Sequence, residues 1–112
     1  MKVLIVEDEP IIAIDLEEIV LNSVAADVVL ASNAAEALRQ VEAGVDFVLL
    51  DVNLGREDET SLPLAHRLMQ EHIPFCFVSG SLERLPATFR CVPKIAKPYR
   101  TRDVESVLPM AA

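Results

Sequence analysis

The sequence predicts an α/β fold in which helices cover both faces of a five-stranded parallel sheet. Short apolar runs, of which residues 45–50 are the clearest, lack the alternation of a half-exposed strand and indicate strands buried on both faces. Between these runs lie amphipathic segments with helical periodicity. Strands and helices that alternate in this way form βαβ units, whose right-handed crossovers place helices on both sides of the sheet.

Five apolar runs bounded by polar or turn-forming residues are the predicted strands. They cover residues 1–6, 27–31, 45–50, 74–78 and 94–96. The segment 81–93 contains Pro86 and Pro93 and few apolar anchors, so the helix expected there is short or irregular. The polar residues 55–61 are expected to form a loop.

Four regular helices are predicted between and after the strands. Pro10 suits the first turn of the first helix, and Asn33 with Glu36 resembles a capping box at the start of the second. Pro63 lies near the start of the third helix, and Thr101 is expected to cap the last. The inner residues are predicted to be Ile12, Leu16, Ile19 and Val20; Ala34, Leu38 and Val41; Leu64, Ala65, Leu68 and Met69; and Val104, Val107 and Leu108.

Composition narrows the classes of protein and partner. The 112 residues suit one domain over 1–112, and the net charge of −8 disfavours nucleic-acid binding. The apolar runs are shorter than the roughly 18 residues of a membrane span, and no signal peptide is evident, so a cytoplasmic location is expected. Cys76 and Cys91 lack the spacing of a metal or redox motif, and Cys76 is expected to be a buried thiol. His66 and His72 are expected at the surface.

Four predicted strands end in residues that can do chemistry. Glu7 and Asp8 follow the first strand, Asp51 follows the third, and Ser79 and Lys97 follow the fourth and fifth. Because parallel strands end at one edge of the sheet, these side chains are expected to lie close together.

Three neighbouring carboxylates need a cation or a proton. Two of them 4 Å apart repel by about 4 kcal/mol at an effective dielectric constant of about 20. Mg²⁺ suits Glu7, Asp8 and Asp51 together with the main-chain carbonyl of Asn53. Together with the Lys97 ammonium, such a site could accept a phosphoryl group on Asp51. Lys97 and the Ser79 hydroxyl would then contact the phosphoryl oxygens.

This set of residues resembles the receiver domain of two-component response regulators. The resemblance rests on Glu7-Asp8, Asp51, Ser79 and the pair Lys97-Pro98, and it spans nearly the whole chain. It implies a doubly wound sheet in the order 2-1-3-4-5 and a cis Lys97–Pro98 peptide bond. It also implies phosphotransfer from a sensor histidine kinase to Asp51, and self-catalysed dephosphorylation instead of enzymatic turnover. Asp8, Asp51 and Asn53 would hold Mg²⁺, with Glu7 acting through water.

A narrower resemblance is to the stand-alone alphaproteobacterial receivers called the FAT GUY group. It rests on residues 74–80, Leu85-Pro86, Phe89-Arg90 and Pro93. Receivers usually carry an aromatic switch residue three positions before the lysine, where this sequence has Lys94. Lys94 and Tyr99 are therefore the candidate switch residues beside Ser79.

The function expected from the sequence is a stand-alone receiver that serves as a protein-interaction switch or a phosphate sink. A histidine kinase and a downstream regulatory protein are the expected partners, and the chain is expected to be a monomer or a weak dimer. One alternative is a phosphatase of the haloacid dehalogenase type, which would need an Asp where this sequence has Asn53. Another is an interaction module that works without phosphorylation.

Overall fold

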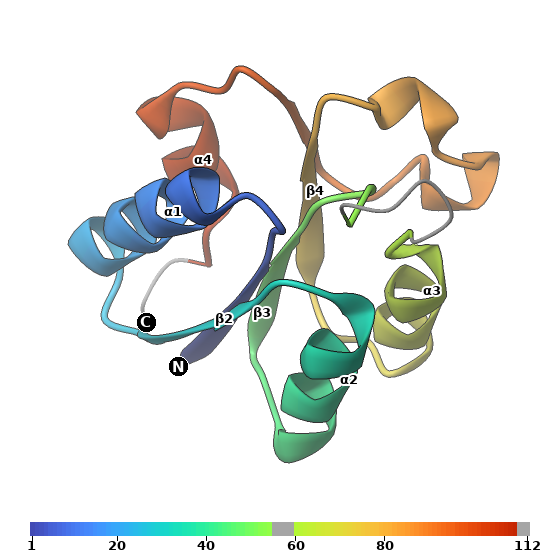
Figure 1. The fold of residues 1–112 in the computed structure, drawn as a ribbon, viewed down its shortest axis with the longest axis horizontal. Coiled ribbons are helices and arrows are strands. Elements are labelled where there is room, and N and C mark those ends of the chain that lie inside the picture. The colour runs from blue at the N-terminus through green and yellow to red at the C-terminus, as the bar shows by residue number, and fades with distance from the viewer. Residues whose placement is uncertain (55–59, 110–112) are drawn as a thin grey trace.

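A parallel sheet runs through the middle of the molecule (Figure 1). The computed structural model describes residues 1–54 and 60–109. The strands are β1 (Lys2–Val6), β2 (Asp27–Ala31), β3 (Phe47–Leu50), β4 (Phe75–Ser79) and β5 (Lys94–Ala96). Their order is β2-β1-β3-β4-β5, which confirms the order implied by the resemblance. Val6 pairs with both Ala31 and Leu50, so these three strands end level with one another.

Two helices cover each face of the sheet. They are α1 (Pro10–Ser23), α2 (Ala34–Ala43), α3 (Leu62–Gln70) and α4 (Thr101–Val107). Figure 1 shows α1 and α4 on one side and α2 and α3 on the other. Side chains alternate along β1 accordingly: Val3 and Ile5 pack toward α1, whereas Leu4 and Val6 pack toward α2 and α3. In the described part of the chain, no helix combines the length and apolar character needed to cross a membrane.

Two short 3₁₀ turns occupy the segment between β4 and β5. They are Leu82–Arg84 and Ala87–Phe89, which confirms the irregular segment predicted from the prolines. Phe89 is completely buried, with its ring 5.4 Å from that of Phe77. This one aromatic anchor, with partly buried Leu82 and Leu85, attaches the segment to the core.

Several inner positions and boundaries differ from the predictions. Leu38 and Met69 are 37% and 38% exposed. On α2 the inner stripe is formed by Ala37 and Val41, four residues apart, and Leu38 lies one residue beyond it. Met69 likewise follows the buried Leu68. Strand β3 begins at Phe47 instead of residue 45.

The cap of the last helix was also predicted one residue too late. Arg100 is the N-cap residue of α4, and its main-chain N–H donates to the Asp103 carboxylate at 3.0 Å. Thr101 is the first helical residue. The remaining surface predictions are confirmed, because His66 and His72 are exposed and Cys76 is a buried free thiol.

Ser61 carries a buried hydroxyl close to the start of α3. Its Oγ is inaccessible and has no hydrogen-bond partner among the described residues, although its main chain bonds to Val52 and Ala65. Ser61→Ala should therefore leave stability unchanged or raise it by about 1 kcal/mol, because a desolvated hydroxyl is removed. Chemical denaturation tests this against Ser23→Ala, whose hydroxyl donates to the Ile19 carbonyl at 2.7 Å. A larger loss for Ser61→Ala than for Ser23→Ala would contradict the prediction.

Candidate functional site

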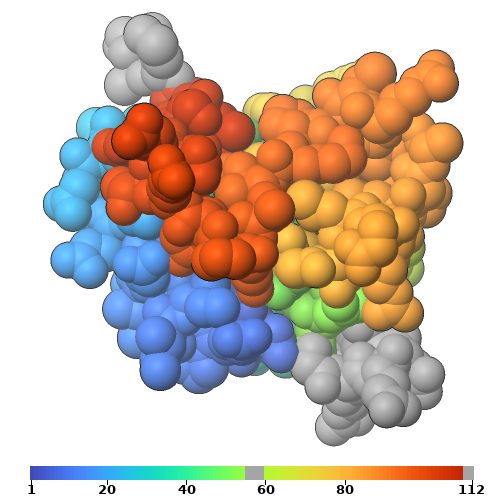
Figure 2. All heavy atoms as spheres, turned by 90° about the horizontal axis from the view of Figure 1, so that it is seen from above, coloured from blue at the N-terminus to red at the C-terminus, as the bar shows by residue number. Residues whose placement is uncertain are grey.

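The carboxyl ends of four strands bring the predicted site residues to one edge of the sheet. Glu7 and Asp51 directly follow β1 and β3, and Lys97 directly follows β5. The ladder continues one residue past the strands, because the Glu7 N–H donates to Ala31 and the Asp51 N–H donates to Val6, both at 3.0 Å. Figure 2 views the molecule from this edge. The apolar strands therefore fix the main chain from which the polar side chains project.

Lys97 holds two of the carboxylates together. Its ammonium lies 2.7 Å from Glu7 Oε2 and 2.8 Å from Asp51 Oδ2. The two carboxylates are shielded from solvent, with Glu7 2% and Asp51 6% exposed, and the Lys97 side chain is 16% exposed. Two carboxylates on one ammonium leave an excess of negative charge in a poorly solvated place.

Asp8 completes a cluster of three acids. One carboxylate oxygen each from Glu7, Asp8 and Asp51 can be chosen so that all three lie within 4.8 Å of one another. Asp8 is half-buried, so the cluster is open on one side. Three carboxylate oxygens with one accessible side are the donor set that suits a hard divalent cation such as Mg²⁺.

The pKa values of Glu7 and Lys97 are shifted because the charged groups are close together and partly buried. Burial raises the pKa of Glu7 to about 7, and the charge of Asp51 acts in the same direction against the hydrogen bond from Lys97. For Lys97, burial lowers the pKa, but hydrogen bonds to Asp51 and Glu7 outweigh that effect and leave the pKa above its usual value. Lys97 therefore stays charged at neutral pH.

Asn53 lies on the loop that follows Asp51, and Ser79 is the last residue of β4. The Asn53 N–H makes a long hydrogen bond of 3.4 Å to Asp51 Oδ1. Ser79 is 1% exposed at the end of β4, and its Oγ accepts the Ser81 N–H at 3.0 Å. The Ser79 hydroxyl proton is therefore directed away from this bond and can serve another acceptor. The Lys97–Pro98 peptide bond is cis, as the resemblance implied.

The two candidate switch residues make their hydrogen bonds to groups outside the acidic cluster. The Lys94 ammonium donates to the main-chain carbonyls of Phe89, Arg90 and Val92 and so ties down the segment before β5. Tyr99 donates a 2.6 Å hydrogen bond to Asp15 on α1. Both residues thus hold a loop in place, and their role in switching stays a prediction.

Sequence reasoning missed one charged neighbour of the site. Arg84, on the first 3₁₀ turn, donates to Asn53 Oδ1 at 3.2 Å. The two residues are 31 positions apart, and no local pattern links them. Only the docking of the loop after β4 against the loop after β3 reveals the contact.

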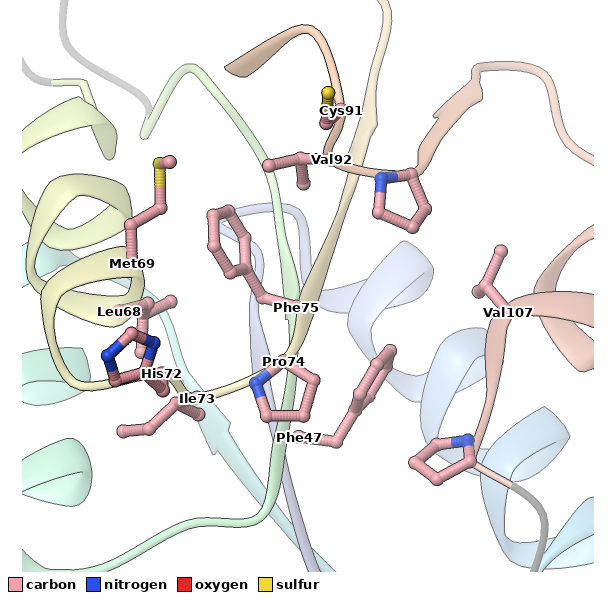
Figure 3. Close-up of a pocket in the computed structure, with 12 residues that line it drawn as sticks. Phe47, Leu68, Met69, His72, Ile73, Pro74, Phe75, Cys91, Val92 and Val107 are labelled. Carbon is pink, nitrogen blue, oxygen red and sulfur yellow. The ribbon is translucent and has the colours of Figure 1, made fainter. Parts of the chain in front are cut away.

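A groove of about 570 Å³ lies apart from these residues (Figure 3). Figure 3 shows Met69 of α3, Phe75 of β4 and Val107 of α4 around it, with Cys91 and Val92 from the segment before β5. It is lined mainly by apolar side chains, and none of the predicted site residues contributes to it. The groove is therefore separate from the residues at the strand ends.

Comparisons with known proteins agree with the geometry. The model of the response regulator receiver domain family matches residues 3–100. No match was found among curated proteins. Among solved structures, SdrG from Sphingomonas melonis Fr1 is 38% identical, with a TM-score of 0.82 over 96% of this chain and 92% of that one.

Two PhyR structures are also similar. The chain is 30% identical to the response regulator PhyR from Brucella abortus, covering 95% of this chain and 45% of that one, with a TM-score of 0.77. The receiver domain of PhyR from Erythrobacter litoralis is 25% identical over 99% of this chain and 95% of that one, with a TM-score of 0.80. The similarity to SdrG and PhyR agrees with the narrower grouping expected from the sequence.

A receiver is a signalling domain and not a classical enzyme, which disfavours the phosphatase alternative. The chain therefore belongs to the response regulator receiver domain family of two-component signalling.

Proposed function

We propose that the chain accepts a phosphoryl group from a sensor histidine kinase on Asp51 in a Mg²⁺-dependent reaction. The observation that carries this proposal is the Asp51 carboxylate, which lies 2.8 Å from the Lys97 ammonium and within a cluster of three acids. A shielded carboxylate with a fixed cation beside it is a suitable nucleophile for phosphorus, since negative charge that develops on the phosphoryl oxygens can be neutralised in place.

The charges of the site call for a divalent cation. When ionised, Glu7, Asp8 and Asp51 carry three negative charges and Lys97 carries one positive charge. The site then has a net charge of −2, which one divalent cation would neutralise. Asp8, Asp51 and the Asn53 carbonyl would hold Mg²⁺, with Glu7 acting through water. The ion would act as a Lewis acid toward the phosphoryl oxygens.

In the transfer step, an Asp51 carboxylate oxygen attacks the phosphorus of a phosphohistidine. A P–O bond forms on Asp51 as the P–N bond to the donor histidine breaks, and the electron pair of that bond returns to the imidazole. The Lys97 ammonium and the Ser79 hydroxyl donate to the phosphoryl oxygens. The Ser81 N–H, which already donates to Ser79 Oγ, orients that hydroxyl.

A small phosphodonor tests the proposal without a cognate kinase. The protein is incubated with acetyl phosphate in Mg²⁺ or in excess chelator, and its intact mass is followed. We expect the mass to increase by one phosphoryl group in Mg²⁺ and to stay unchanged in chelator. An unchanged mass in Mg²⁺ would overturn the proposal and favour the phosphorylation-independent interaction module.

An exposed apolar patch on α1 is the surface proposed for the kinase. Ile11 and Ile14 are 84% and 57% exposed on the helix that follows Glu7 and Asp8. Ile14 also lines a cavity of about 300 Å³ together with Leu30 and both acids. Isoleucines left so exposed on the helix that follows two residues of the acidic cluster favour contact with an apolar partner surface.

Ile11→Ser combined with Ile14→Ser should slow phosphorylation by a phosphorylated histidine kinase by about tenfold or more, since a lost apolar contact of about 1.4 kcal/mol is one factor of ten. Phosphorylation by acetyl phosphate should be unchanged, because the small donor needs no docking surface. Leu21→Ser, at the far end of α1 and 52% exposed, is the matched control. Equal slowing with both donors would show damage to the site instead of lost docking.

The remaining expectations from the sequence are kept as part of the proposal. Output would pass through a downstream regulatory protein, or the chain would act as a phosphate sink. A single domain over 1–112, a stand-alone role, a cytoplasmic location and a monomeric or weakly dimeric state stay predictions.

A further inference from the structure

The Lys94 ammonium binds three main-chain carbonyls of the segment that precedes β5. It lies 2.7 Å from the oxygens of Phe89 and Val92 and 3.2 Å from that of Arg90. An ammonium group has three N–H donors, so this side chain uses all of them on one short stretch of main chain. In the described part of the chain it forms no salt bridge, and residues 84–102 contain no Asp or Glu. Lys94 therefore holds main chain and not another side chain.

Apolar burial contributes little to holding residues 90–93. The ring of Phe89, just before them, is completely buried and lies 5.4 Å from that of Phe77. At the other end, the Pro93 carbonyl accepts from the Phe77 N–H at 3.0 Å. Between these two anchors the side chains are exposed or half-buried, so little apolar surface is removed from water there. The hydrogen bonds from Lys94 supply the attachment that burial does not.

The same residues form one side of the apolar groove. Cys91, Val92 and Pro93 line it, and Figure 3 shows Cys91 and Val92 on one side of the groove and Met69 of α3 on another. We refer to residues 90–93 as the groove wall. The carbonyls that Lys94 binds belong to this wall or directly precede it. A movement of the wall would therefore change the shape of the groove.

We propose that Lys94 is a latch whose charged ammonium keeps the groove wall in place, and that release of the latch opens the groove on this side while the rest of the fold stays intact. The inference goes beyond the proposed function and does not depend on phosphorylation of Asp51. A lysine is favourable beside carbonyls at the end of a helical turn, because those oxygens lack partners within the turn. A side chain of similar length without the charge would leave them to solvent. The opening would be confined to the wall, because the anchors on either side of it remain.

Amide hydrogen exchange in Lys94→Met measures the release. The N–H groups of Arg90 and Val92 donate to the carbonyls of Ala87 and Phe89, both at 3.0 Å, and serve as the reporter amides. In Lys94→Met both should exchange about tenfold faster, which corresponds to about 1.4 kcal/mol in the free energy of local opening. Lys94→Arg, which keeps a charged donor, should recover part of the protection.

Two controls separate release of the latch from a general loss of stability. The Leu85 N–H donates to the Leu82 carbonyl at 3.1 Å in the first 3₁₀ turn, and its exchange should stay unchanged in Lys94→Met. Lys2→Met removes a cation from the start of β1 and should leave the reporter amides unchanged. Wild-type exchange of the reporter amides in Lys94→Met would overturn the inference. So would an equal acceleration at Leu85 or in Lys2→Met, because the loosening would then not be specific to the latch.

Discussion

Asp51→Asn is expected to take up no phosphoryl group from any donor. The carboxamide lacks the negatively charged oxygen that attacks phosphorus, and it leaves Lys97 with Glu7 as its remaining acidic partner at the site. Intact mass after incubation with acetyl phosphate and Mg²⁺ measures the effect. Asp27→Asn changes an exposed carboxylate at the start of β2 and should be phosphorylated like the wild type. Undiminished labelling of Asp51→Asn would place the acceptor elsewhere.

Lys97→Met is expected to cause the largest loss of stability. It leaves the buried carboxylates of Glu7 and Asp51 without their shared ammonium, and breaking a buried ion pair in this way costs about 3 kcal/mol. Urea denaturation in excess chelator measures the loss. Lys2→Met, at the start of β1, is the control and should have little effect. At a pH above the pKa of Glu7, Glu7→Gln in the Lys97→Met background should recover much of the stability, because it removes one of the two uncompensated charges.

The stability lost in Lys97→Met should also depend on pH. Burial raises the pKa of Glu7 from 4.5 to about 7 in the folded protein. Between these values the folded state binds a proton that the unfolded chain has released, so the stability of the metal-free protein falls as pH rises. The fall should extend to higher pH in Lys97→Met, because the hydrogen bond that lowers the pKa of Glu7 is lost. If the free energy of unfolding of Lys97→Met were the same at pH 4.5 and at about pH 7, Glu7 could not be the titrating group.

The convergence of Glu7, Asp51 and Lys97 could be predicted because each directly follows an apolar run. A strand buried on both faces must end where the first polar residue appears, and parallel strands end at one edge. The strand order came from the family resemblance and not from the periodicity. Leu38 was misplaced because a helix that covers a sheet needs only a narrow stripe, and the sequence offers neighbouring apolar residues on either side of that stripe.

The contacts of the loops could not be predicted from the sequence. Two side-chain hydrogen bonds join residues far apart in the chain, Arg84 with Asn53 and Tyr99 with Asp15. Each depends on how an irregular segment packs against the rest of the fold. The position of Lys94 before Lys97 predicts a switch role, which stays a prediction; the hydrogen bonds from its ammonium to three carbonyls of the preceding segment could not be predicted. Neither periodicity nor capping patterns carry information about such long-range polar contacts.

Titration with Mg²⁺, followed residue by residue in NMR spectra of the backbone amides, tests the central claim most directly. The strand-end cluster predicts saturable shifts that concentrate at Asp8, Asp51 and Asn53, and that disappear in Asp8→Asn. Shifts that are absent, that concentrate away from these residues, or that persist unchanged in Asp8→Asn would contradict a divalent-cation site around the acceptor.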